Sequence, residues 1–156
     1  MPRRPRIALA GFPLHIIQRG NNRSACFFAE DDCALYLRHL GELSQEFGCR
    51  VHAYVLMTNH LHLLLTPEEV DSASLTMKHL GQRYVQHVNR TYRRSGTLWE
   101  GRFKSSPVSP AYLLPCSRYI ELSPVYSCLA SSPDHYSWSS YRARIPIRSA
   151  GSDRER

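Results

Sequence analysis

The alternation of hydrophobic and polar positions in residues 53–65 is the clearest pattern in the chain. Two apolar runs flank Thr58-Asn59, which predicts two strands joined by a tight turn, a hairpin spanning residues 50–66. Successive side chains of a strand point to opposite faces, so His60 and His62 should share one face with Leu64. The other face should belong to a core formed by Leu61, Leu63 and Leu65.

The same criteria predict two further strands and three helices. Residues 12–18 alternate as a strand, and apolar residues recur at helical spacing from Glu30 until Gly48 ends the helix. A second amphipathic helix begins near Ser72 or Ser74, residues 98–108 form an extended run, and a third helix spans 109–122 because Pro124 cannot continue it. This order predicts an α+β fold, a ferredoxin-like antiparallel sheet with helices packed on one face.

Length and composition favour one domain with a polyanionic partner. Of 156 residues, we expect 1–11 to be a basic arm, 12–143 the folded domain and 144–156 a disordered basic tail. The net charge of +7 comes almost entirely from arginine, which forms forked contacts with phosphate, although a biased composition would give the same charge. Five cysteines without C-x-x-C spacing, and no apolar run near ~18 residues, predict a soluble protein of the reduced cytoplasm. With a nucleic acid as the polyanionic partner, we expect it to be associated with the nucleoid.

Two groups of residues carry candidate chemistry. His60 and His62, about 7 Å apart along one strand face, can hold a single metal ion, although surface histidines occur by chance in basic proteins. Basic residues interleaved with aromatic rings are typical of single-strand-binding surfaces, where bases stack between phosphate contacts. Each cation could equally belong to a solvated face. The candidate DNA-binding residues are Arg19, Arg23, Arg83, Arg90, Arg93, Trp99, Arg102 and Lys104.

Several segments together resemble one family. The run Leu56-Met57-Thr58-Asn59-His60-Leu61-His62-Leu63-Leu64-Leu65 resembles the histidine motif of the HUH endonucleases, and more narrowly that of the REP-associated tyrosine transposases, which are single-tyrosine enzymes. Four further segments match the family in order, so that the resemblance covers residues 6–143. They are residues 17–23, 96–104, 118–125 and 136–141.

The resemblance implies a palm-shaped domain that nicks and rejoins single-stranded or hairpin DNA through a 5′-phosphotyrosine. It implies Tyr119 as nucleophile, His60 and His62 as metal ligands for Mg²⁺ or Mn²⁺, and a monomer or homodimer. A third ligand, commonly an amide, falls at Ser123, where a hydroxyl is a shorter and poorer donor. The alternative is a catalytically decayed DNA-binding protein. A metal-dependent RNA phosphoesterase would need a second histidine motif or a carboxylate cluster, and the sequence has neither.

Overall fold

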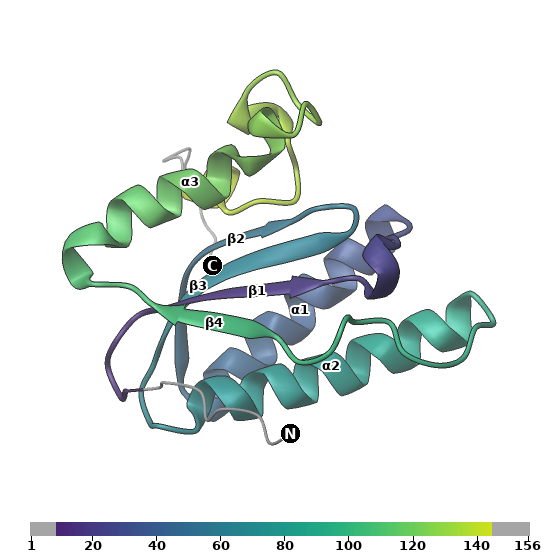
Figure 1. The fold of residues 1–156 in the computed structure, drawn as a ribbon, viewed down its shortest axis with the longest axis horizontal. Helices are drawn as coiled ribbons and strands as arrows, with labels where there is room; N and C mark the ends of the chain where they lie inside the picture. Colours follow the sequence, from purple (N-terminus) through teal and green to yellow (C-terminus); the bar gives the residue numbers. More distant parts are fainter. Residues whose placement is uncertain (1–8, 145–156) are drawn as a thin grey trace.

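The computed structural model describes residues 9–144, in which four strands and four α-helices follow one another (Figure 1). Most of the predicted arm (residues 1–8) and nearly all of the predicted tail (145–156) lie outside the described residues. The strands are β1 (Leu14–Arg19), β2 (Cys49–Leu56), β3 (His60–Pro67) and β4 (Lys104–Pro107). The helices are α1 (Glu30–Phe47), α2 (Ser72–Thr91), α3 (Leu113–Tyr126) and the short α4 (Tyr141–Arg144), with 3-10 turns η1 (Asn21–Arg23), η2 (Pro110–Tyr112) and η3 (Pro133–His135).

The four strands form one antiparallel sheet in the order β2-β3-β1-β4. The predicted hairpin is β2 and β3, joined at Thr58-Asn59, and β1 pairs with the other side of β3. In this register Ile17 lies opposite His62, and His15 lies opposite Leu64. Strand β3 is therefore central in the sheet, and both of its faces must be covered.

Helices α1 and α2 cover one face of the sheet, as the sequence predicted. Their apolar stripes meet the sheet in the larger core, which includes Leu61, Leu63 and Leu65 from β3 together with Leu14 and Ile16 from β1. The predicted α+β class, with an antiparallel sheet and helices packed on it, is confirmed.

The third helix packs on the opposite face, which the expectation of helices on a single face did not include. Ile120 of α3 is fully buried against Val55, Met57 and Leu64 in a second, smaller core (Figure 1). The physical reason is that β3 is apolar on both faces: Leu63 faces α1 and α2 while Leu64 faces α3. This second face is the one that carries His60 and His62.

The bounds of the third helix differ from the prediction of 109–122. Residues 110–112 form the 3-10 turn η2, and α3 continues through Pro124 to Tyr126. Because Pro124 has no amide hydrogen, the helix loses one hydrogen bond, the one that residue 124 would donate to the carbonyl of Ile120. The carbonyl of Pro124 accepts the Leu129 amide at 2.8 Å, so this end of the helix remains hydrogen-bonded. A terminal turn tolerates this loss better than a helix centre does.

The start of α1 is held by a buried carboxylate. Asp32 accepts the amides of Phe28 and Ala29 at 3.0 Å each, and also the side chains of His87 and Tyr92 from the end of α2, at 2.7 Å each. Burial alone would raise the pKa of Asp32, but these hydrogen bonds outweigh it and the pKa is lowered. Asp32 thus caps α1 and ties it to α2.

The fourth strand is shorter than predicted, and the aromatic C-terminal segment covers an edge of the sheet. Only Lys104–Pro107 pair with β1, while residues 98–103 form bends and a single bridge.

The C-terminal segment that contains Trp138 and Ser140 is hydrogen-bonded to β2. The Leu56 amide donates to the carbonyl of Trp138 at 2.8 Å, and the Ser140 amide donates to that of Tyr54 at 3.0 Å. These bonds close the outer edge of β2.

Candidate active site

His60 and His62 share one face of β3, as the strand alternation predicted, and this is the face that α3 covers. The two ring centroids are 5.2 Å apart and the rings meet edge to face. His60 is half-buried at the beginning of β3, whereas His62 is only 5% exposed. The pair therefore opens toward solvent at the His60 end.

A neighbouring amide fixes the protonation of His60. The Oδ1 atom of Asn59 lies 2.8 Å from Nδ1 of His60, and because a carbonyl oxygen can only accept, Nδ1 must carry the proton. The Asn59 Nδ2 group donates to the carbonyl of Arg23 at 3.4 Å, which orients the amide. Burial and then the charge of Arg19 lower the pKa of His60, so that the neutral ring presents its Nε2 lone pair.

His62 is hydrogen-bonded to a third histidine, His15 on β1, which the sequence interpretation missed. The Nε2 atom of His15 lies 3.0 Å from Nδ1 of His62, and the rings stack with centroids 5.2 Å apart. Burial, followed by His15 and His60, lowers the pKa of His62 to about 3, and burial lowers that of His15. The available signal was the alternation of residues 12–18, which puts His15 and Ile17 on one face of the first strand.

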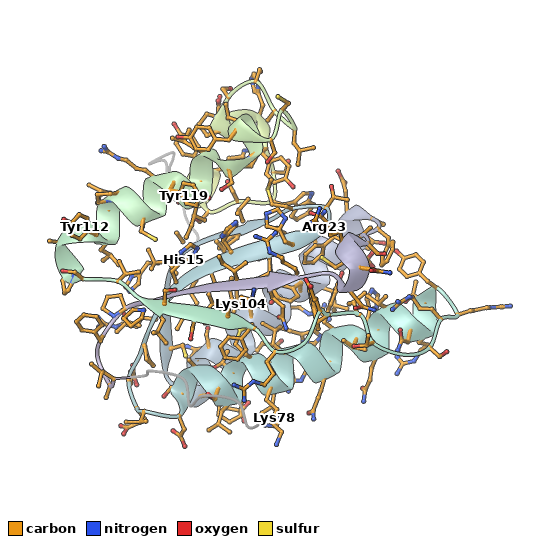
Figure 2. The ribbon with its side chains drawn as sticks, in the orientation of Figure 1. His15, Arg23, Lys78, Lys104, Tyr112 and Tyr119 are labelled. Atoms are coloured by element: carbon orange, nitrogen blue, oxygen red, sulfur yellow. The ribbon has the colours of Figure 1, made fainter. Side chains whose placement is uncertain are left out.

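Helix α3 brings Tyr119 to these rings. Its side chain is 51% exposed, and its ring centroid lies 6.0 Å from that of His62 and 6.4 Å from that of His15. Figure 2 shows Tyr119 and His15 facing each other across the space between α3 and the sheet. A second exposed tyrosine on the helix, Tyr126, has its ring 6.3 Å from that of Tyr119.

Ser123 follows Tyr119 by one helical turn, and its hydroxyl is hydrogen-bonded within the helix. Its Oγ donates to the carbonyl of Tyr119 at 3.0 Å, and the residue is 6% exposed. Within residues 9–144, no group of three histidine, cysteine, aspartate or glutamate side chains is placed to share a metal ion. The candidate donors for a divalent ion are therefore the two neutral imidazoles of His60 and His62, which would leave other positions for water or phosphate oxygens.

Three of the predicted DNA-binding cations line a hollow of about 550 Å³ beside His60. They are Arg19, Arg23 and Lys104, and Asn59, His60 and Glu100 complete the lining. The turn at Gly20 brings Arg19 and Arg23 there, because the Gly20 amide donates to the carbonyl of Asn59 at 2.8 Å. A Cβ at Gly20 would lie 2.1 Å from the carbonyl oxygen of Ser24, so only glycine fits this turn.

The other predicted cations are not among the residues that line this hollow. Arg83 and Arg90 line a groove of about 350 Å³ between α1 and α2, the two helices on the opposite face of the sheet, where Arg83 also pairs with Glu42 at 3.3 Å. Arg93 is exposed in the turn after α2, and Arg102 is exposed before β4. The structure therefore does not gather the predicted DNA-binding residues at one site.

Trp99 corrects the prediction of an exposed stacking ring. It is 7% exposed, belongs to the larger core, and has its ring centroid 6.1 Å from that of Tyr84, which is itself fully buried. The bridge between Gly20 and Trp99 turns this segment inward. A base cannot stack on an indole whose faces are packed in the core.

Comparison with known proteins identifies the family. The family model described as "Transposase IS200 like" matches residues 9–123, which include His15, the His60/His62 pair and Tyr119. The chain belongs to the IS200-like transposase family. As a transposase of this family it is assigned to DNA transposition and DNA binding.

Two solved structures resemble the fold of this transposase. A REP-associated tyrosine transposase bound to a REP hairpin is 17% identical and has a TM-score of 0.77, with 97% of this chain and 92% of that chain covered. A candidate transposase from Deinococcus radiodurans R1 is 21% identical and has a TM-score of 0.52, with 77% and 96% covered. The resemblance to tyrosine transposases inferred from the sequence motifs is thus confirmed at the level of family and fold.

One further comparison finds no relative, and the helices of the described residues show no membrane span. A search of curated protein sequences finds no match to this transposase. Across residues 9–144, none of its helices combines the length and the apolar character that a membrane span needs.

Proposed function

We propose that this transposase is a single-strand DNA endonuclease and strand transferase that uses Tyr119 as its nucleophile at hairpin-flanked or palindromic repeats. The observation that carries the proposal is the exposed phenol of Tyr119 beside two neutral histidines, with ring centroids 6.0 Å and 6.4 Å away. An exposed tyrosine has no packing reason to lie against such a pair, whereas a nucleophile needs accessible, polar surroundings.

The proposed reaction is a reversible transesterification. The phenol oxygen of Tyr119 attacks the phosphorus of a DNA phosphodiester, its proton leaves, and a bond between that oxygen and phosphorus forms. The bond from phosphorus to the 3′ oxygen breaks, and that oxygen takes up a proton, which gives a free 3′-hydroxyl and a 5′-phosphotyrosine. A 3′-hydroxyl of another strand can then attack the phosphotyrosine and release Tyr119, so no external energy source is required.

His60 and His62 are the proposed ligands of Mg²⁺ or Mn²⁺. Such an ion, when bound, supplies positive charge to a non-bridging phosphate oxygen and so stabilises the transition state. The protein contributes the two neutral imidazoles and holds them on a rigid central strand. Imidazole favours the later divalent metals, so we expect tighter binding of Mn²⁺ than of Mg²⁺ in vitro.

The proposed substrate is single-stranded DNA next to a hairpin. Arg19, Arg23 and Lys104 put three positive charges around a hollow that adjoins His60, where a strand entering the site would pass. The structurally similar transposase bound to a REP hairpin supports the choice of a hairpin substrate.

An adduct assay tests this proposal. A labelled single-stranded oligonucleotide with a hairpin, incubated with the protein and Mn²⁺, should yield a covalent protein–DNA product that survives denaturing electrophoresis. Tyr119→Phe should abolish the product, whereas Tyr126→Phe, which removes an exposed hydroxyl from the same helix, should retain it. Formation of equal adduct by wild type and Tyr119→Phe would refute Tyr119 as the nucleophile.

The position of Ser123 supports a second candidate function, binding of the same DNA without cleavage. The short Ser123 side chain is 6% exposed and is hydrogen-bonded to the Tyr119 carbonyl of its own helix, so it is a poorer third ligand than the longer amide side chain expected there. This alternative predicts hairpin binding that weakens steeply with salt, no adduct, and no effect of metal. Adduct formed by Ser123→Asn but not by wild type would identify an enzyme that has lost one ligand.

A further inference from the structure

His15 on β1 lies next to the ring nitrogen of His62 that is not the proposed metal-binding one. In the β1–β3 register it stands opposite Leu64, which makes it a diagonal neighbour of His62 on the face that α3 covers. Its Nε2 atom is 3.0 Å from Nδ1 of His62, and the two ring planes are inclined by 27°. Figure 2 shows His15 on the side of the sheet that faces α3 and Tyr119.

Two ring nitrogens at this distance share one proton, because two N–H groups cannot point at each other. Either His62 donates from Nδ1, which leaves its Nε2 as a bare lone pair, or His15 donates and His62 carries its proton on Nε2. Only the first arrangement lets His62 bind a metal ion through Nε2.

The surroundings of the pair favour the first arrangement. His60 is held in the same way, with Asn59 accepting its Nδ1 proton and its Nε2 left free. Among the side chains of residues 9–144, the fully buried polar atoms without a partner are Tyr36 Oη and Trp99 Nε1, and Nε2 of His62 is not one of them. Both rings of the motif are therefore anchored through Nδ1 and can present Nε2 outward.

We propose that His15 is a positioning residue that accepts the Nδ1 proton of His62 and so fixes the tautomer and orientation in which His62 binds the divalent ion. This inference rests on the proposed function for the metal, but its structural part, the tautomer of His62, does not require metal to be present. Hydrogen-bond partners of metal-bound histidines typically contribute about 10- to 100-fold to metal affinity.

The test uses His15→Gln and His15→Leu in the full chain. The Gln amide oxygen can accept the Nδ1 proton, whereas Leu has similar bulk and no acceptor. Long-range proton–nitrogen correlation NMR of the metal-free protein should show His62 protonated at Nδ1 in wild type and His15→Gln. In His15→Leu, part of the population should shift to the Nε2-protonated tautomer. Titration with Mn²⁺, followed by its electron paramagnetic resonance signal, should give about 10- to 100-fold weaker binding for His15→Leu and near-native binding for His15→Gln.

The outcomes separate this inference from the proposed function. A wild-type His62 protonated at Nε2, or equal Mn²⁺ affinity in His15→Leu and wild type, overturns the role of His15. If His15→Leu does not fold, the wild-type NMR spectrum alone decides the tautomer. Adduct formation that persists in Tyr119→Phe would instead refute the nucleophile and leave the tautomer result unaffected.

Discussion

Replacement of Ile120 by Ala tests how firmly α3, the helix of the proposed nucleophile Tyr119, is attached to the sheet. Ile120 is fully buried and is the only α3 residue in the buried part of the smaller core among the described residues; its buried partners are Ala53, Val55, Met57 and Leu64. Truncation of a buried Ile to Ala costs about 2–5 kcal/mol. We expect about 3 kcal/mol, because a small core beneath a single helix can partly collapse. Ile120→Val should cost about 1 kcal/mol.

The assay has a global and a local measurement. Urea unfolding followed by circular dichroism gives the change in unfolding free energy, and amide hydrogen exchange reports the opening of α3. A loss of 3 kcal/mol corresponds to roughly a 100-fold larger open population, which should appear in α3 before it appears in β1 or β3. Because Tyr119 precedes Ile120, adduct formation should fall as well.

Leu114→Ala is the matched control for this variant. Leu114 lies on the same helix and is 55% exposed, so its truncation should change the unfolding free energy by no more than about 0.5 kcal/mol. If Ile120→Ala and Leu114→Ala cost the same, or if exchange from α3 is unchanged by Ile120→Ala, then the smaller core does not hold the helix.

Three other predictions concern charge. Because the pKa of His62 falls from 6.5 to about 3, only the unfolded chain takes up this proton between those values in metal-free buffer. The free energy of unfolding should therefore decrease by up to about 1.4 kcal/mol per pH unit as pH drops from 6.5 toward 3. Urea unfolding at a series of pH values measures this dependence, and the same change with pH in wild type and His62→Gln would contradict the prediction. Asp32→Ala should lower the unfolding free energy by about 3 kcal/mol more than Asp31→Ala, which removes an exposed carboxylate from the same helical turn; similar urea midpoints would refute the capping role. Lys104→Ala should lower by about 0.7 the slope of the logarithm of DNA affinity against the logarithm of salt concentration. Lys78→Ala, which removes an exposed lysine from α2, should leave this slope unchanged (Figure 2). Fluorescence anisotropy over a series of salt concentrations measures this slope, and an equal effect of both lysines would place the DNA elsewhere.

The hairpin and the first two helices were predictable because their signals are local. The alternation around His60 and His62 fixes which side chains share a face, and Gly48, with φ of 81°, ends α1 where glycine permits a left-handed residue. Pro124 misled the prediction of α3, because a proline in the final turn costs less than one in a helix centre.

The residues that the sequence did not reveal depend on long-range register. His15 meets His62 across 47 positions, and one histidine in a short strand gives no sign of which residue it will face. The polar sides of α2 were recognisable, but the side of the sheet on which Arg83 and Arg90 would lie was not. Trp99 was taken for a surface ring because it stands among basic residues, while its actual packing follows from the bridge with Gly20.

The double burial of β3 has a consequence for how such a protein changes over evolutionary time. Without α3, the apolar side chains of Ala53, Val55 and Leu64 would be exposed to water, so the helix is needed for solubility whether or not it performs chemistry. Tyr119, by contrast, is 51% exposed and is not part of that smaller core. Selection for a folded chain therefore preserves the helix but not Tyr119, and a copy of the gene can lose the proposed strand transfer by one substitution while keeping its fold.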